Sequence, residues 1–217
     1  MEADFWHTRW ENAQIGFHEG EVNRMLAAHI GALSLGSGAR IFVPLCGKTR
    51  DIAWLMSKGF RVAGAELSEI AVQQLFDEIA LSPRITREGP LKHYAAQDID
   101  IFVGNIFDLT PEDLGTVDAV FDRAALVALP DEMRGRYTQH LARITGQAPQ
   151  LLVTFEYDQS VMSGPPFSLS ESEVKDRYGA LYDVTPLQDA EVIGGLKGVC
   201  PAREKALLLL PIQAVSR

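Results

Sequence analysis

The segment Arg40-Ile-Phe-Val-Pro-Leu-Cys-Gly-Lys48 carries the first indication of how this chain folds. Its first half is a short run of apolar and β-branched residues, which is typical of a buried strand, and Gly47 follows where the chain must turn. Residues 51–58 then carry apolar side chains at helical spacing, and Gly59 stands where such a helix would end. A buried strand, a tight turn and a helix in this order predict an α/β unit.

The same alternation continues along the chain. Residues 61–65 predict a second strand, and Ser68 is suited to cap a helix over residues 69–80. The further expected elements are strands at 101–103, 118–121 and 151–155, helices at 130–145 and 170–178, and a closing antiparallel hairpin formed by 191–193 and 205–210 around Gly194-Gly195. The fold class is therefore α/β, a doubly wound, mostly parallel sheet with a closing antiparallel strand.

Two segments do not fit a minimal version of this pattern. Residues 1–35 are interpreted as an N-terminal helical lid attached to a core of residues 36–217 in one domain, although simple packing against the sheet is the alternative. Residues 81–100 are polar and are interpreted as a surface loop, which either closes over a ligand or has no role beyond connecting two elements. The residues behind these two interpretations are the aromatic Phe5, Trp6, Trp10 and Phe17, and the turn-forming Pro83, Gly89 and Pro90.

Composition excludes several classes of protein. The 217 residues are 47% hydrophobic and 23% charged, which is ordinary for a globular domain of this size. The longest apolar run, residues 124–129, is far shorter than the ~20 residues of a membrane span. The net charge of −9 disfavours nucleic acid, and the acidic start and two widely spaced cysteines favour a reducing compartment. We expect a cytoplasmic monomer that binds neither nucleic acid nor membrane.

The ends of the first two predicted strands indicate a binding site. Ligands of open α/β sheets bind at the carboxyl ends of the strands, and Gly47 allows the backbone to approach a ligand closely. Glu66 stands 19 residues later (66 − 47), where a carboxylate can accept both hydroxyls of an adenosine ribose. Neither a three-glycine loop nor a P-loop is present, so a nucleoside without a pyrophosphate, such as S-adenosylmethionine, is expected. The alternative is a tight turn beside a solvated carboxylate.

Six motifs occur together and in order along the chain. They are Phe5-Trp-His-Thr-Arg-Trp10, Ile15-Gly-Phe-His18, Val43-Pro-Leu-Cys-Gly-Lys48, Gly64-Ala-Glu-Leu-Ser68, Asn105-Ile-Phe-Asp-Leu109 and Asp122-Arg-Ala-Ala-Leu-Val-Ala128. With these motifs the sequence resembles the thiopurine S-methyltransferase family over nearly its whole length. The resemblance implies a Rossmann-like methyltransferase sheet, S-adenosyl-L-methionine as cofactor and a small-molecule acceptor.

The resemblance also implies roles for individual residues. The expected cofactor contacts are Trp6, Trp10, Leu45, Gly47, Glu66, Asn105, Ile106 and Arg123. Arg123 is also the candidate catalytic residue, because a cation at the end of a strand favours an incoming thiolate. Phe17 and His18 are the candidate acceptor-binding residues. The five histidines show no metal-ligand spacing, so no metal site is expected.

The leading hypothesis is an S-adenosylmethionine-dependent methyltransferase that acts on the sulfur of small aromatic or heterocyclic thiols. Such a reaction needs an in-line approach, a dry pocket and an ionised nucleophile rather than covalent help from the protein. Two alternatives remain open. One is methylation of selenium, tellurium or other metalloid species, and the other is a non-catalytic module that only binds S-adenosylmethionine.

Overall fold

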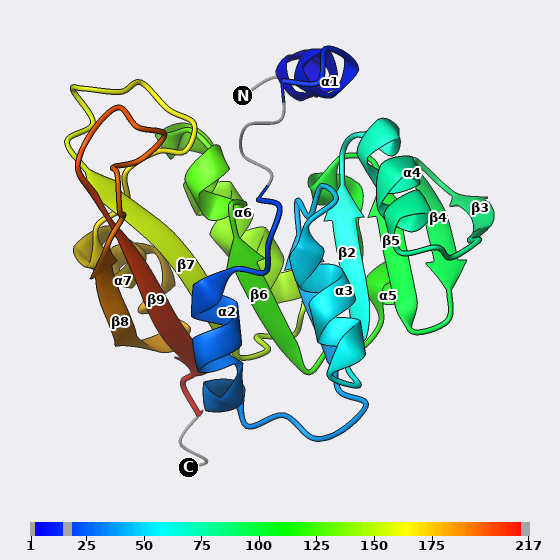
Figure 1. Ribbon diagram of the computed structural model, residues 1–217. Coiled ribbons are helices and arrows are strands. Elements are labelled where there is room, and N and C mark those ends of the chain that lie inside the picture. The colour runs from blue at the N-terminus through cyan, green and yellow to red at the C-terminus, as the bar shows by residue number, and fades with distance from the viewer. Residues whose placement is uncertain (1–2, 15–18, 214–217) are drawn as a thin grey trace.

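The computed structural model describes residues 3–14 and 19–213, and one central sheet organises them (Figure 1). The described strands form this sheet in the order β3-β4-β5-β2-β1-β6-β7-β9-β8. Its five central strands run parallel, as expected, and an antiparallel pair extends each edge. The parallel strands are β5 (Ile99–Val103), β2 (Arg61–Glu66), β1 (Arg40–Pro44), β6 (Ala119–Arg123) and β7 (Gln150–Tyr157).

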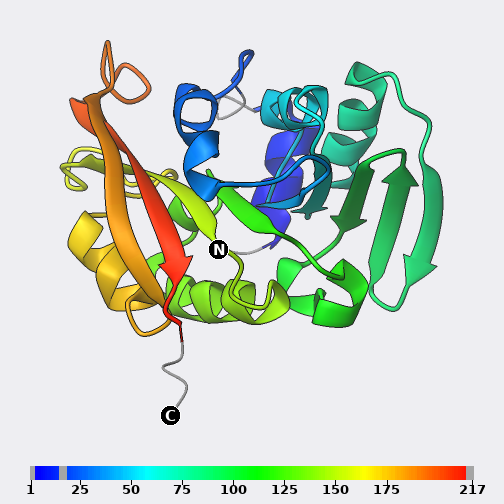
Figure 2. The same ribbon diagram turned by 90° about the horizontal axis from the view of Figure 1, so that it is seen from below.

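Helices cover both faces of the sheet (Figure 2). Successive side chains of a strand point to opposite faces, so Ile41 and Val43 of β1 pack in one core cluster and Phe42 packs in the other. One face carries α2 (Arg24–His29), η1 (Ile30–Leu33), α3 (Arg50–Ser57) and α4 (Glu69–Glu78). The other carries α5 (Pro111–Leu114), α6 (Asp131–Ile144) and α7 (Glu171–Tyr178). The predicted doubly wound α/β fold is therefore confirmed.

Side-chain caps start the helices that follow the strands. The Thr49 hydroxyl accepts the backbone N–H of Asp51 at the start of α3, and the Ser68 hydroxyl accepts that of Ala71 at the start of α4. At the start of α7 the Ser170 hydroxyl likewise accepts the N–H of Glu173. Each cap satisfies an N–H group that has no partner inside its helix. Two short 3-10 turns, η2 (Ile106–Asp108) and η3 (Leu126–Ala128), follow β5 and β6.

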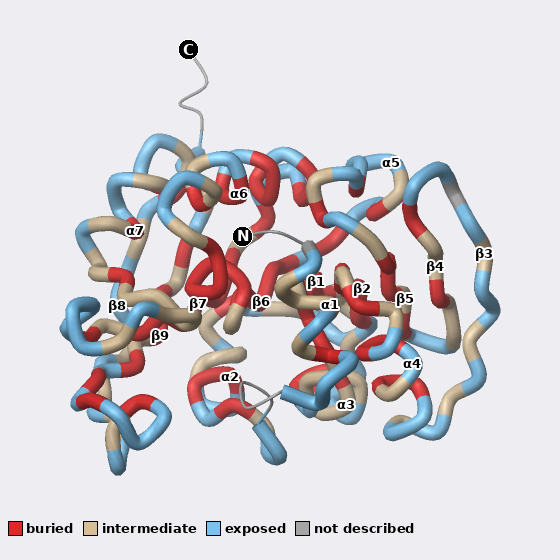
Figure 3. The backbone as a smooth tube through the Cα atoms, turned by 90° about the horizontal axis from the view of Figure 1, so that it is seen from above, coloured by how far each residue is buried: buried red, intermediate tan, exposed pale blue. Residues whose placement is uncertain are grey.

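The interpretation of residues 81–100 as a surface loop is wrong. These residues form β3 (Arg84–Glu88) and β4 (Leu91–Ala96), and β4 pairs antiparallel with β5. Polar side chains dominate the segment because β3 is the edge of the sheet, and Figure 3 shows β3 coloured mostly as exposed. Leu91 and Tyr94 are nevertheless buried, and Gly89 makes the turn between the strands with a φ of 61°.

The opposite edge confirms the closing antiparallel strand but corrects its partner. β9 (Ala202–Pro211) pairs antiparallel with β7, and β8 (Tyr182–Glu191) pairs with β9. The hairpin strand predicted at residues 191–193 therefore ends where it was expected to begin. An irregularity between Pro186 and Gln188 interrupts the alternation of β8 and hides the strand in the sequence. Gly194-Gly195 lies in the connection between β8 and β9.

The N-terminal region contains α1 (Ala3–Glu11) before α2. α1 lies above the sheet, beyond the end of β2, rather than on either face (Figure 1). Neither hydrophobic cluster includes a buried residue of α1. No helix in the described ranges is long and apolar enough to cross a membrane.

Candidate active site

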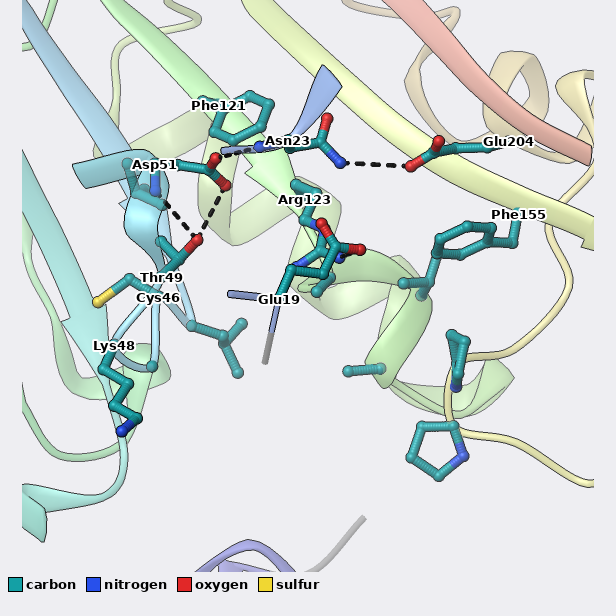
Figure 4. Close-up of a pocket in the computed structure, with 18 of the residues that line it drawn as sticks. Glu19, Asn23, Cys46, Lys48, Thr49, Asp51, Phe121, Arg123, Phe155 and Glu204 are labelled. Atoms are coloured by element: carbon teal, nitrogen blue, oxygen red, sulfur yellow. Dashed lines mark hydrogen bonds and ion pairs between the residues drawn. The ribbon is translucent and has the colours of Figure 1, made fainter. Parts of the chain in front are cut away.

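A cavity of about 640 Å3 lies at the carboxyl ends of the central strands. Its lining comes from α1, from residues 19–24, from the loops after β1 and β2, from the end of β6, and from two loops beside β7 and β9. Figure 4 shows that Cys46, Lys48 and Thr49 lie on one side of the cavity and Phe155 lies on the other. The cavity is therefore where ligands of open α/β sheets bind.

The loop after β1 and the end of β2 form one wall of this cavity. The Gly47 N–H donates to Glu66 Oε2 and the Ser68 N–H donates to Glu66 Oε1, each over 2.8 Å. Glu66 is buried, and this burial raises the pKa of its carboxyl group. Each carboxylate oxygen has a second lone pair, so the carboxylate can still accept two ligand hydroxyls. The predicted contact of Glu66 with a ribose therefore stays a prediction that this geometry allows.

Trp10 of α1 packs directly on this loop. Gly47 has a φ of 52°, and a Cβ at this position would lie 3.2 Å from a ring carbon of Trp10. Trp6 and Leu45 also line the cavity, and Leu45 adopts a positive φ of 45°. A larger residue at position 47 would therefore strain the loop and push Trp10 away.

The end of β6 brings Arg123 to the cavity. Its guanidinium forms an ion pair with the carboxylate of Glu19, and only 9% of the Arg123 side chain is exposed. The two residues are 104 positions apart. No local pattern could therefore have indicated Glu19, which sequence reasoning missed. Figure 4 shows this pair between the two sides of the cavity.

Asp122 precedes Arg123 and points to the other face of the sheet. Its carboxylate accepts the Tyr137 hydroxyl over 2.7 Å and the Leu126 N–H over 3.1 Å. The side chain is fully buried, and this desolvation raises the pKa of Asp122 to about 6. These bonds tie the end of β6 to α6 and to the turn after Arg123.

A buried polar network forms another part of the lining, and sequence reasoning missed it. The Asn23 N–H donates to Asp51 Oδ1 over 2.7 Å, and the Asn23 side-chain amide donates to Glu204 Oε1 over 3.3 Å. Arg24 Nε donates to Glu204 Oε2 over 3.1 Å. The network links the start of α2 to α3 and β9 (Figure 4). Because Asn23 and Glu204 are 181 positions apart, only the folded chain brings them together.

The remaining predicted residues lie elsewhere. Asn105 and Ile106 are not among the described residues that line the cavity. The Asn105 side chain accepts a hydrogen bond from the Phe107 N–H at the start of η2. The Ile106 carbonyl oxygen accepts a hydrogen bond from His140 Nε2. Their roles as cofactor contacts stay predictions. Phe17 and His18 lie outside the described residues.

Two further side chains of the loop after β1 have ordinary structural contacts. Cys46 is buried, and burial raises the pKa of its thiol, with the charge of Glu66 raising it further. A nucleophilic thiolate is therefore disfavoured. Lys48 is paired with Glu78 over 2.7 Å. Cys200, the other cysteine, is buried and free.

Several solved structures with a similar architecture are methyltransferases. A 1,6-didemethyltoxoflavin-N1-methyltransferase from Burkholderia thailandensis, solved with its substrate and S-adenosylhomocysteine, has a TM-score of 0.66 at 16% identity and covers 96% of this chain and 87% of that one. A TehB-like SAM-dependent methyltransferase from Corynebacterium glutamicum has a TM-score of 0.59 at 13% identity, covering 97% and 98%. These likenesses identify the fold as that of the S-adenosylmethionine-dependent methyltransferases.

Sequence comparison then narrows the class to a family. The family model described as Thiopurine S-methyltransferase (TPMT) matches residues 1–204. The thiopurine S-methyltransferase of Xanthobacter autotrophicus is 58% identical over 96% of this chain and 99% of its own length. That of Gluconobacter oxydans is 50% identical over 97% and 96%. The chain belongs to the thiopurine S-methyltransferase family, and it is an S-adenosylmethionine-dependent methyltransferase.

Proposed function

We propose that the protein transfers a methyl group from S-adenosylmethionine to the sulfur of small aromatic or heterocyclic thiols. The observation that carries this proposal is one cavity that joins a buried carboxylate at the end of β2 to an apolar wall on the far side of β6. The family relationship supports the same acceptor class, because its curated relatives are named for methyl transfer to thiopurine sulfur.

The described residues support a division of roles within the cavity. Glu66 binds the ribose hydroxyls, and Trp6, Trp10, Leu45 and Gly47 surround the nucleoside and keep out water. When bound, S-adenosylmethionine supplies a methyl group on a sulfonium, whose sulfur keeps the electron pair of the broken bond while the acceptor sulfur forms the new one. Arg123 binds the thiolate form of the acceptor in place of Glu19, its half-exposed partner, because a cation stabilises a nearby anion.

The proposal also includes α1 as a lid over the cavity, a monomeric state and a cytoplasmic location. α1 serves as a lid, since Trp6 and Trp10 line the cavity from outside the sheet while α1 adds no buried residue to either core cluster. Within the predicted lid segment 1–35, α1 then acts as the lid, whereas α2 and η1 pack on the sheet with the core of residues 36–217. A cytoplasmic monomer fits two buried free cysteines and an acidic chain.

The direct test is methyl transfer by the purified protein. S-adenosylmethionine with a labelled methyl group is incubated with 6-mercaptopurine, thiophenol or selenite, and the products are separated. We expect methyl thioethers and S-adenosylhomocysteine in equal amounts from both thiols. Cofactor binding without transfer to either thiol would contradict the proposal, as would transfer to selenite alone.

A further inference from the structure

The charged residues around the cavity are mostly neutralised by neighbours. Burying a charge without a partner is unfavourable, so cations that line a cavity normally have carboxylate partners. Most of the lining cations follow this rule among the described residues. The pairs are Arg24 with Glu204, Lys48 with Glu78 and Arg123 with Glu19.

Two lining cations depart from this rule in the described ranges. Arg9 of α1 and Lys197 of the connection between β8 and β9 both line the cavity, and neither forms an ion pair with a described carboxylate. The Arg9 guanidinium carbon lies 4.5 Å from the ring centre of Phe5, and Arg9 Nε is buried without a hydrogen-bond partner. Lys197 Nζ donates to the carbonyl oxygen of Pro165 over 2.6 Å.

The two cations act on each other. Burial lowers the pKa of Lys197, and the positive charge of Arg9 lowers it further. Two like charges that repel one another at a cavity wall are stabilised together when an anion binds between them. Among the described residues no carboxylate forms an ion pair with either cation, so an anionic group of a ligand can supply the negative charge there.

The backbone at Lys197 supports a functional interpretation. Lys197 has a φ of 53°, in the left-handed region that residues other than glycine and asparagine rarely adopt. The flanking Gly195 and Gly198 also have positive φ, so the connection turns sharply on both sides of the lysine. Strained residues of this kind concentrate where a side chain must be held in one position for function. Here the strain accompanies a lysine that reaches into the cavity.

The position of Lys197 separates it from the nucleoside wall. Glu66 ends β2, whereas Lys197 follows β8 and precedes β9. β2 and β9 are four strand spacings apart in the sheet, on the order of 20 Å. The connection between β8 and β9 lies at the same end of the strands as α1 (Figure 1). It also carries Ile193, an 89% exposed apolar residue at the cavity rim.

We propose that Arg9 and Lys197 form an anion subsite that selects aromatic thiols bearing a second acidic group, such as a carboxylate. This inference rests on the proposed function and names its acceptor class more closely. The apolar Phe155, Pro166 and Leu196 line the same cavity and suit the aromatic ring, while the two cations bind the acidic group.

The test compares two acceptors that differ in one charge. 4-Mercaptobenzoate and its methyl ester both ionise at sulfur, but only the first carries a carboxylate. The wild type should have a higher kcat/KM for the acid than for the ester. Lys197→Met and Arg9→Met should each lower this ratio by about tenfold to a hundredfold, as expected for losing a charge-assisted hydrogen bond.

Two control variants sharpen the comparison. Lys197→Arg keeps the charge and should retain the preference for the acid. Lys175→Met removes a lysine of α7 that pairs with Glu171 and does not line the cavity, so it should leave the ratio unchanged. Equal losses with the acid and the ester in Lys197→Met would overturn the subsite, because they would mean that the lysine acts on the thiolate or on the fold.

A binding measurement keeps the subsite and the proposed function distinguishable. If the wild type methylates neither 4-mercaptobenzoate nor its methyl ester, the proposed function fails. The subsite is then tested by calorimetric binding of 4-(methylthio)benzoate in the presence of S-adenosylhomocysteine. Binding that Lys197→Met weakens by tenfold or more supports the subsite. No binding, or binding that the variant leaves unchanged, overturns it.

Discussion

The two sides of the cavity are built in different ways. The side proposed to bind the nucleoside, around Gly47 and Glu66, is formed by the ends of two adjacent parallel strands and is buried. The side proposed to bind the acceptor, around Pro165 and Lys197, is formed by connections beside β7 and between β8 and β9 and includes the exposed Ile193. Rigid strand ends suit a constant cofactor, and loops allow acceptor preference to vary without disturbing it.

Removing residues 1–19 should have the largest effect on methyl transfer, because it changes both sides of the cavity. The deletion takes away Trp6, Trp10 and Arg9 and so opens both sides of the cavity at once. We expect methyl transfer to fall at least about a thousandfold through lost positioning and water exclusion. The sheet should remain folded in circular dichroism and thermal unfolding, because α1 contributes no buried residue to either core cluster.

A smaller change checks the same point. Trp10→Ala should lower activity strongly, whereas Trp54→Ala, on α3 and outside the cavity lining, should affect stability more than transfer. A fully active truncated protein would contradict the role of α1 as a lid.

The second largest effect is the change of stability with pH that is expected from Asp122 of β6, the strand between the two sides. The folded-state pKa of Asp122 is about 6, above its ordinary value of 3.8, so its contribution to stability is complete below pH 3.8 and is lost as the pH rises through 6. This loss amounts to about 3 kcal/mol at most, at 1.36 kcal/mol per pH unit. Chemical denaturation of the wild type and of Asp122→Asn, from pH 4 to 7, measures it.

The asparagine variant isolates Asp122 from other titrating groups. Its amide can still accept the Leu126 N–H and can donate to the Tyr137 oxygen. The difference in the free energy of unfolding, wild type minus Asp122→Asn, should therefore decrease as the pH rises from 4 to 7. A difference that stays constant with pH would show that Asp122 does not titrate as described.

On the nucleoside side, Glu66→Ala should weaken S-adenosylhomocysteine binding by about 1.5–3 kcal/mol, the range for losing hydrogen bonds to a charged group. Isothermal titration calorimetry provides the measurement. Glu171→Ala, which removes a carboxylate from α7, is the matched control and should bind as the wild type does. An unchanged dissociation constant in Glu66→Ala would refute the ribose assignment.

The smallest expected effect is that of Gly47→Ala. The positive φ and the contact with Trp10 should together reduce the free energy of unfolding by about 1–2 kcal/mol. Gly36→Ala is a suitable control, because a Cβ at Gly36 meets no atom within 4 Å. Thermal unfolding of the two variants should therefore differ, and equal melting temperatures would argue against strain at Gly47.

The same contrast explains which parts of the molecule could be predicted from the sequence. The nucleoside side depends on a strand, a turn and a second strand that lie close together in the chain, so Gly47 and Glu66 could be recognised from spacing. The resemblance to a family added Trp10 and Arg123, which indeed line the same cavity. Asn105 and Ile106, taken from the same resemblance, do not line it in the described structure.

Long-range contacts could not be predicted in this way. Glu19 meets Arg123, and Asn23 meets Glu204, only after the whole sheet has formed. The edge strand β3 was missed because an exposed strand needs few apolar side chains and therefore resembles a loop in composition. Its neighbour β4 was missed because its buried residues, Leu91 and Tyr94, are three positions apart and do not alternate. β8 was misplaced because the irregularity at Pro186 breaks its alternation.

A crossed titration tests the central claim, the separation of the two sides, most directly. Two quantities are measured for wild type, Glu66→Ala and Lys197→Met: the dissociation constant of S-adenosylhomocysteine, and the Michaelis constant for the acceptor 4-mercaptobenzoate at saturating cofactor. We expect Glu66→Ala to weaken S-adenosylhomocysteine binding by tenfold or more and to change the Michaelis constant little. Lys197→Met should raise the Michaelis constant and leave S-adenosylhomocysteine binding nearly unchanged. If each variant weakened both ligands equally, the two sides would not be separate sites.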